Sequence, residues 1–183
     1  MNHDDTTTML NHVGQRIATG LDVPQAITFL ASLQYSLAPA QRGDLSKAWP
    51  TFALALITDS TYGVLQARHA RGYGRRAIQA VATLLLRVLD SDTVTISERD
   101  AVIVATRQPQ ASSEGASIHS NDANYAAGAC CYVEHVDACC YIAACEYAAH
   151  AYRYMAGSDY DMKRCEAHWA WQASTLLNAV AGC

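Results

Sequence analysis

A stretch rich in alanine, cysteine and tyrosine, from Asp122 to Ala156, constrains the fold of this chain more than any other. It contains no proline, and its single glycine, Gly128, lies near its start. Alanine has the highest intrinsic helix propensity, so the stretch predicts one long helix, or two collinear ones, around which other helices pack. At about 1.5 Å per residue such a helix would span on the order of 50 Å. We therefore expect it to protrude or to bend near Val133–Ala138.

The rest of the chain shows helical periodicity interrupted by stop signals. The segment 108–121 is rich in Ser, Gln and Gly and predicts a loop. After Gly157, a last helix is expected to pack antiparallel on the long one. The sequence thus predicts an all-α (mainly α), single-domain bundle of about six to eight helices over residues 1–183. Its N-terminal helices are expected in 1–107, and the long helix and the C-terminal helix in 122–183.

Several helices have identifiable signals at their ends. Asp22 is expected to cap a helix that carries Pro24 in its first turn, where no backbone donor is lost. Thr95 and Glu98 form a capping-box pattern for a helix over Ile96–Arg107. Because the residues of Asp92–Ala105 are also rich in β-branched side chains, short strands remain an alternative there.

Three apolar patterns predict buried helix faces. The segment from Pro50 to Ile57 is apolar almost throughout. The helix after Asp22 is expected to bury Ile27, Leu30, Ala31 and Leu37. The last helix is expected to bury Met162, Cys165, Trp169, Ala173, Leu176 and Val180.

The long helix offers one face on which tyrosines recur. That face comprises Tyr125, Ala129, Tyr132, Val136, Cys139, Ala143, Tyr147, His150 and Tyr154. Tyrosine rings fill space between helices while their hydroxyl groups seek water or a polar partner. If function lies near this helix, we expect it on the tyrosine-bearing surface that neighbouring helices leave open.

Composition and charge exclude several classes of protein. Hydrophobic residues make up 51% of the chain and charged residues 16%, which is not the composition of a disordered segment. The net charge is −4, and residues 114–183 hold three basic and eight acidic side chains, which argues against non-specific nucleic-acid binding. The start of the chain lacks a signal-peptide pattern, and the one apolar candidate for a membrane span carries several ionisable groups. A cytoplasmic protein without a membrane segment is expected.

The seven cysteines favour reduced, packed thiols over a disulfide framework, because five of them fall on the same predicted helix. One subset offers a different chemistry. Cys131, His135 and Cys139 are spaced by four residues and would share one helix face, and thiolates and imidazoles are zinc ligands. A metal- or redox-linked bundle using these three residues is therefore the first alternative function; otherwise no cofactor and no catalytic residues are expected.

Two further groups are candidates for binding. Arg68, Arg71, Arg75 and Arg76 form the chain's basic cluster, and a nucleic-acid-binding regulator that uses the Arg68–Arg76 segment is the second alternative. Exposed aromatic side chains with nearby acidic groups would suit a protein partner. These protein-binding candidates are Trp171, Tyr152, Tyr154, Tyr160, Asp159 and Asp161.

The YAA, ACCY and EYAAHAY runs, followed by a final helix carrying WQASTLL, resemble a group of alanine-rich helical bacterial and phage proteins. That group includes proteins described as immunity proteins, and the resemblance covers Asn124–Leu177. It implies a small, non-enzymatic protein that neutralises a partner protein by binding it. The leading hypothesis is therefore a stoichiometric protein-binding inhibitor of the immunity or phage anti-defence type, such as an anti-CRISPR. The sequence leaves self-association open.

Overall fold

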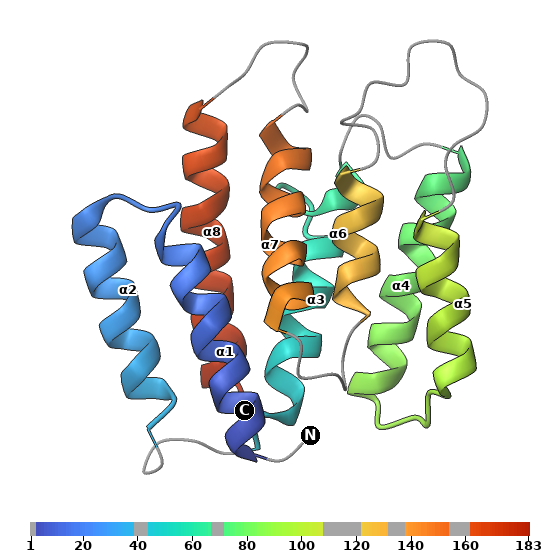
Figure 1. Cartoon of the computed structure of the whole chain (residues 1–183), viewed down its shortest axis with the longest axis horizontal. Helices are drawn as coiled ribbons and strands as arrows, with labels where there is room; N and C mark the ends of the chain where they lie inside the picture. Colours follow the sequence, from blue (N-terminus) through green and yellow to red (C-terminus); the bar gives the residue numbers. More distant parts are fainter. Residues whose placement is uncertain (1–2, 39–43, 67–71, 108–121, 132–137, 154–161) are drawn as a thin grey trace.

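The computed structural model describes residues 3–38, 44–66, 72–107, 122–131, 138–153 and 162–183. Eight α-helices and two short 3₁₀-helices form this described part, and it contains no strand. They are α1 (His3–Ala18), α2 (Val23–Ser36), η1 (Leu45–Lys47), α3 (Ala48–Thr58), η2 (Val64–Gln66), α4 (Gly72–Leu89), α5 (Ile96–Arg107), α6 (Asp122–Cys130), α7 (Ala138–Arg153) and α8 (Met162–Ala181). The fold is the all-α helical bundle that the sequence predicts (Figure 1).

The prediction of one long central helix is wrong. The stretch forms two helices, α6 and α7, which pack side by side and run in opposite directions (Figure 1). The α6 helix ends in a turn in which the Cys131 N–H donates to the Gly128 carbonyl at 3.2 Å. The expected bend near Val133–Ala138 falls almost wholly in residues 132–137, outside the described residues. Folding back lets both helices bury small side chains that a protruding helix would leave in water.

The core forms around α7, which contacts α1, α3, α6 and α8. Its Tyr141, Ala144, Cys145 and Ala148 side chains are fully buried. As predicted, α8 packs antiparallel against α7 (Figure 1). The buried stripe of α8 is confirmed from Trp169 to Val180, but Met162 at its start is 51% exposed.

The α3 helix is the most apolar of the buried elements. Trp49, Phe52, Leu56 and Ile57 are all less than 2% exposed, as its sequence predicts. The same residues pack against a cluster that draws members from α1, α4, α6, α7 and α8. One hydrophobic cluster thus joins the N-terminal helices to the C-terminal ones. Among the described residues no helix combines the length and apolarity needed to cross a bilayer.

The predicted cap of α2 is confirmed, and its predicted buried face is confirmed only in part. Asp22 Oδ1 accepts a hydrogen bond from the Gln25 N–H at 2.8 Å, and Pro24 lies in the first turn. Leu37 is buried and Leu30 partly buried, as predicted, but Ile27 is 65% exposed and Ala31 is also exposed. The helix buries Phe29 and Leu33 instead. Apolar side chains occur on most sides of α2, so periodicity alone did not identify the side that faces α1 and α8.

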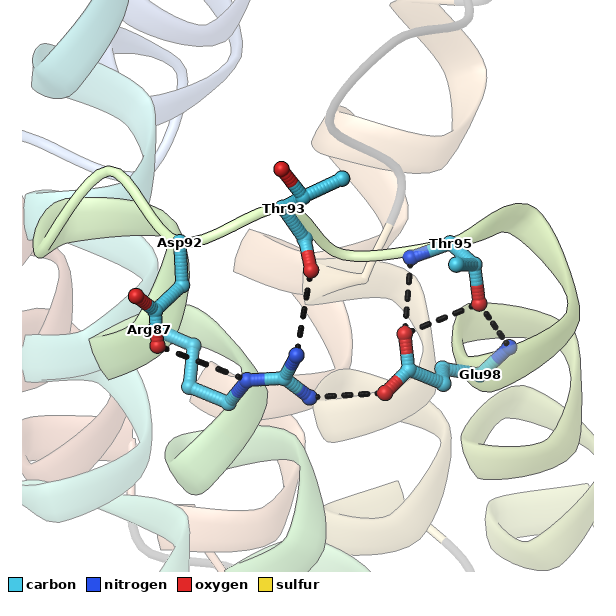
Figure 2. A network of polar contacts seen from close by, with 5 residues as sticks. All are labelled: Arg87, Asp92, Thr93, Thr95 and Glu98. Atoms are coloured by element: carbon cyan, nitrogen blue, oxygen red, sulfur yellow. Dashed lines mark hydrogen bonds and ion pairs between the residues drawn. The ribbon is translucent and has the colours of Figure 1, made fainter.

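The turn between α4 and α5 shows the predicted capping box (Figure 2). The residues from Ile96 onward form the α5 helix, so the alternative of short strands in Asp92–Ala105 is wrong. Glu98 Oε2 accepts from the Thr95 N–H and hydroxyl, each at 2.8 Å, and the Glu98 N–H donates to Thr95 Oγ1 at 3.2 Å. The Arg87 guanidinium donates to Glu98 Oε1 at 2.9 Å. The Thr95 backbone contact, followed by the bonds from Arg87 and from the Thr95 hydroxyl, lowers the pKa of Glu98 to about 2.

We expect Thr95→Ala to lower the free energy of unfolding by about 1 kcal/mol, because α5 loses its N-terminal side-chain acceptor. Thr93→Ala is the matched control, since Thr93 contributes only its backbone carbonyl to Arg87, at 3.0 Å (Figure 2). Urea denaturation of the two variants measures the difference. Equal stabilities would show that the Thr95 hydroxyl does not cap α5.

Candidate protein-binding surface

Folding α6 back on α7 brings two distant tyrosines together. Tyr125 and Tyr147 are 22 residues apart, which in one straight helix would separate them by about 33 Å. In the structure their ring centroids are 5.4 Å apart, with the ring planes inclined by 47°. Both rings are partly open to solvent, with 40% of Tyr125 and 36% of Tyr147 exposed.

The α5 and α6 helices approach closely beside these rings. At Gly128 of α6, a Cβ atom would lie 2.4 Å from the hydroxyl oxygen of Thr106 on α5. The Thr106 side chain is buried, and its hydroxyl donates to the Ile103 carbonyl at 2.8 Å. A larger residue at position 128 would therefore displace the Thr106 hydroxyl from its hydrogen bond or move α5 relative to α6.

The crossing leaves a recess of about 260 Å³ between α5, α6 and α7. Its lining consists of Thr106, Arg107, Tyr125, Gly128, Ala129, Cys139, Cys140, Ala143 and Tyr147. We call the two tyrosines and this recess the tyrosine surface. The recess is smaller than the pockets of about 300–1,000 Å³ that hold drug-sized ligands, so it suits a side chain of a docking protein.

The thiols divide into a buried and an accessible set, and none of the seven cysteines forms a disulfide. Cys130, Cys131 and Cys145 are fully buried, and burial raises the pKa of each, to about 12 for Cys131. These three are packed core thiols, as predicted. Cys139 is exposed at the edge of the tyrosine surface.

The helix face proposed to hold a metal does not form as predicted. Cys131 lies just beyond α6 and Cys139 in the first turn of α7, so no continuous helix joins them. Cys131 is buried and Cys139 exposed, while His135 lies outside the described residues. Within the described ranges, no group of three metal-ligating side chains is close enough to hold an ion.

Trp171, predicted as an exposed anchor, is instead half-buried in an aromatic cluster. Its ring stacks on Tyr62 with centroids 5.2 Å apart and an interplanar angle of 18°. Tyr152, also a predicted anchor, lies 5.0 Å from Tyr62 and 5.1 Å from the ring of His168. Trp171 therefore packs against Tyr62, in the turn before η2, and does not form an exposed anchor.

The polar centre of this cluster is His168, whose side chain is fully buried. Its Nε2 lies 3.2 Å from the Tyr62 carbonyl, and its Nδ1 lies 2.8 Å from Gln172 Nε2, which also donates to the Cys145 carbonyl at 3.0 Å. Both histidine contacts are hydrogen bonds when Nε2 carries the proton and Nδ1 accepts. Burial lowers the pKa of His168 to about 4, although the Tyr62 contact opposes this shift.

Most other predicted binding residues fall outside the described residues. They are Tyr154, Tyr160, Asp159, Asp161, Arg68 and Arg71. Of the basic cluster, Arg75 and Arg76 are described, and both are exposed near the start of α4. Arg75 donates to the Leu65 carbonyl at 2.7 Å, so it stabilises the end of η2. The nucleic-acid alternative stays a prediction.

A larger cleft of about 630 Å³ lies between the end of α1 and the start of α8, but its principal polar groups serve the fold. Arg16 pairs with Glu146 of α7 at 2.5 Å and lies 4.7 Å over the Trp169 ring. Asp22 caps α2. The tyrosine surface combines exposed aromatic rings with a recess and is therefore the better candidate.

Comparison of the chain with known protein families, curated proteins and solved structures finds no match.

The sequence placed the tyrosine surface on one helix face without identifying its two central residues. Tyr125, Ala129, Cys139, Ala143 and Tyr147 all belong to the predicted tyrosine-bearing face, and all of them line the recess. These five residues could therefore be predicted from the sequence. The reversal of chain direction, which places the first half of the face beside the second, could not.

Proposed function

We propose that this protein is a non-enzymatic, cytoplasmic inhibitor that binds a partner protein stoichiometrically through the tyrosine surface. The immunity and phage anti-defence types, including anti-CRISPR proteins, are the classes to which we assign it. The observation that carries the proposal is the pairing of the exposed rings of Tyr125 and Tyr147 over a side-chain-sized recess. Tyrosines beside a pocket are typical of the residues that dominate binding energy at protein interfaces.

The surface would act by occluding the partner's working face. The two rings supply apolar area at a small cost in side-chain entropy, and the recess accepts one projecting side chain of the partner. Arg107 at the recess adds a guanidinium group, another side chain enriched at such sites. This mechanism requires no reaction, only a partner surface that fits the tyrosines.

We expect the double variant Tyr125→Ser/Tyr147→Ser to recover the partner at least about tenfold less well than wild type, since loss of one central anchor costs about 2 kcal/mol. Affinity capture from lysates of the native host, uninfected and phage-infected, measures this. Leu86→Ser is the matched control, because Leu86 is 49% exposed on α4, away from the tyrosine surface. Circular dichroism should show that both variants keep the wild-type helix content.

Retention of the same partner by the double variant would exclude the tyrosine surface as the binding site. Titration of the captured partner's activity then distinguishes binding from catalysis. An end-point at a fixed ratio of chains supports stoichiometric inhibition. Inactivation of many partner molecules by one chain would contradict it.

A further inference from the structure

The α2 helix lies at one edge of the bundle, packed against α1 and α8 (Figure 1). Its outer side carries a row of exposed apolar residues. Val23 is 72% exposed, Ile27 65% and Tyr35 66%, and Ala31 between them is also exposed. These residues are spaced by four, so they form one ridge along the helix, which we call the α2 stripe. Single exposed apolar residues are ordinary, but a continuous row of them indicates an interaction site.

The α2 helix also carries no charged residue over its whole length. A water-facing helix normally bears charged side chains on its outer side. In a two-fold symmetric contact the same surface meets itself, so any net charge would face a like charge. An uncharged apolar helix avoids this repulsion, and it offers a charged partner nothing to pair with. These properties favour a second copy of the same helix as the occupant.

The order of side chains along the α2 stripe is self-complementary. A two-fold axis between Ile27 and Ala31 places Ile27 of one copy against Ala31 of the other, a large side chain against a small one. The same axis places Val23 against Tyr35 of the second copy. Both pairs occur twice, and neither opposes two bulky side chains.

A groove beside the stripe gives the tyrosine ring a place to bind. It has a volume of about 450 Å³ and lies between α2 and α8, with Leu21, Pro24, Phe29, Ala173 and Leu177 among its lining residues. Pro24 is next to Val23, so Tyr35 of a second copy would arrive at the edge of this groove. The mainly apolar lining suits the ring, and the open side leaves its hydroxyl in water.

We propose that the chain forms a two-fold symmetric dimer through the α2 stripe, with Tyr35 of each copy packed at the other's α2–α8 groove. The area buried by one helix pair with its groove contacts lies at the lower end of the range for specific interfaces, about 1,200 Å² in total, so we expect a reversible dimer. This contact leaves the tyrosine surface of each copy unoccupied. The inference does not depend on the proposed function.

Sedimentation equilibrium of the full chain, without any other protein, tests the dimer. The wild-type mass should rise with concentration from 19.8 kDa toward twice that value. Ile27→Glu should remain at the mass of one chain throughout, because each copy would bury an unpaired carboxylate. Ile96→Glu is the matched control: Ile96 is 70% exposed on α5, and this variant should dimerise like wild type.

Folding is monitored by circular dichroism, and Tyr35→Ser provides a second variant that weakens the same contact without a buried charge. A wild type that stays at one chain at all concentrations would overturn the proposal. So would a dimer that persists in both Ile27→Glu and Tyr35→Ser, or an equal loss of dimer in Ile96→Glu.

Mixing variants tests the register of the helix pair. Ile27→Glu and Ala31→Lys should each be monomeric alone and should associate when mixed, because the carboxylate introduced in one copy then faces the ammonium group introduced in the other. Tyr35→Lys should not rescue Ile27→Glu, because position 35 faces Val23. Rescue by Tyr35→Lys and not by Ala31→Lys would exclude the proposed two-fold axis.

Discussion

Lowering the pH from 7 to 4 should reduce the free energy of unfolding by on the order of 3 kcal/mol through His168 alone. The buried ring has a pKa of about 4, below its usual value of 6.5. As the pH falls through 6.5, the unfolded chain takes up a proton that the folded chain refuses, so unfolding is favoured. The loss begins near pH 6.5 and is nearly complete near pH 4, and each pKa unit corresponds to about 1.4 kcal/mol. Above pH 6.5 the ring is neutral in both the folded and the unfolded chain, so this loss of stability vanishes.

His168→Gln separates this effect from the titration of carboxylates. At pH 7 it should cost about 1–3 kcal/mol, because the Tyr62 carbonyl and Gln172 lose their bonds to the ring. Between pH 6.5 and 4, however, its stability should fall less steeply than that of wild type. His150→Gln is the matched control, since it removes an exposed imidazole from α7 instead of the buried one.

Urea denaturation at several pH values measures these slopes. A wild-type slope that matches that of His168→Gln would show that the ring titrates as it does in water. The capping box at α5 adds to the loss at the acidic end of this window. The folded pKa of Glu98 is about 2, against an ordinary value of 4.5, so near pH 4 the unfolded chain protonates Glu98 while the folded chain keeps it ionised. Wild type and His168→Gln share this effect, so it cancels when their slopes are compared.

The helical class and several helix ends follow from the sequence, because their causes are local. The cap at Asp22 and the capping box at Thr95 and Glu98 each need only a side-chain oxygen and a backbone N–H a few residues away. The burial of α3 follows from its composition. No particular tertiary partner is needed to predict these features.

Features that depend on tertiary packing were not predictable in the same way. An alanine-rich stretch is equally compatible with one helix or with two that fold back, since both have the same local propensity. The gain that favours folding back comes from burying small side chains against α1, α5 and α8. The position of α2 is another case: its apolar residues surround the helix, and only its neighbours determine that Ile27 faces water while Leu33 faces the core.

The tyrosine surface depends on the same packing choice. Its residues share one predicted face, but the contact between Tyr125 and Tyr147 exists only because α7 reverses direction. For Trp171, the sequence predicted exposure where the structure shows packing. Trp171 lies outside the buried stripe of α8 and was therefore expected to face water, but Tyr62, in the turn before η2, stacks on its ring.

Trp49→Ala should cause the largest loss of stability, about 3–5 kcal/mol, because it leaves a cavity where α3 meets α7. The Trp49 ring is 1% exposed and lies edge-on against Tyr141, with centroids 4.6 Å apart and an interplanar angle of 84°. It also contacts Phe52 at 5.8 Å. Against a typical total of about 5–15 kcal/mol, this loss should be visible as partial unfolding at 37 °C.

Trp49→Phe tests why the loss occurs. The buried Nε1 of Trp49 makes no hydrogen bond to any residue that the structure describes, so phenylalanine sacrifices ring volume without breaking a polar contact. Its cost should be less than half that of Trp49→Ala in urea denaturation. Equal losses in the two variants would show that the indole N–H, and not the ring packing against Tyr141, holds α3 to α7. Because α7 also carries Tyr147, a destabilised α3–α7 contact should weaken partner capture only where the chain unfolds, unlike substitutions on the tyrosine surface itself.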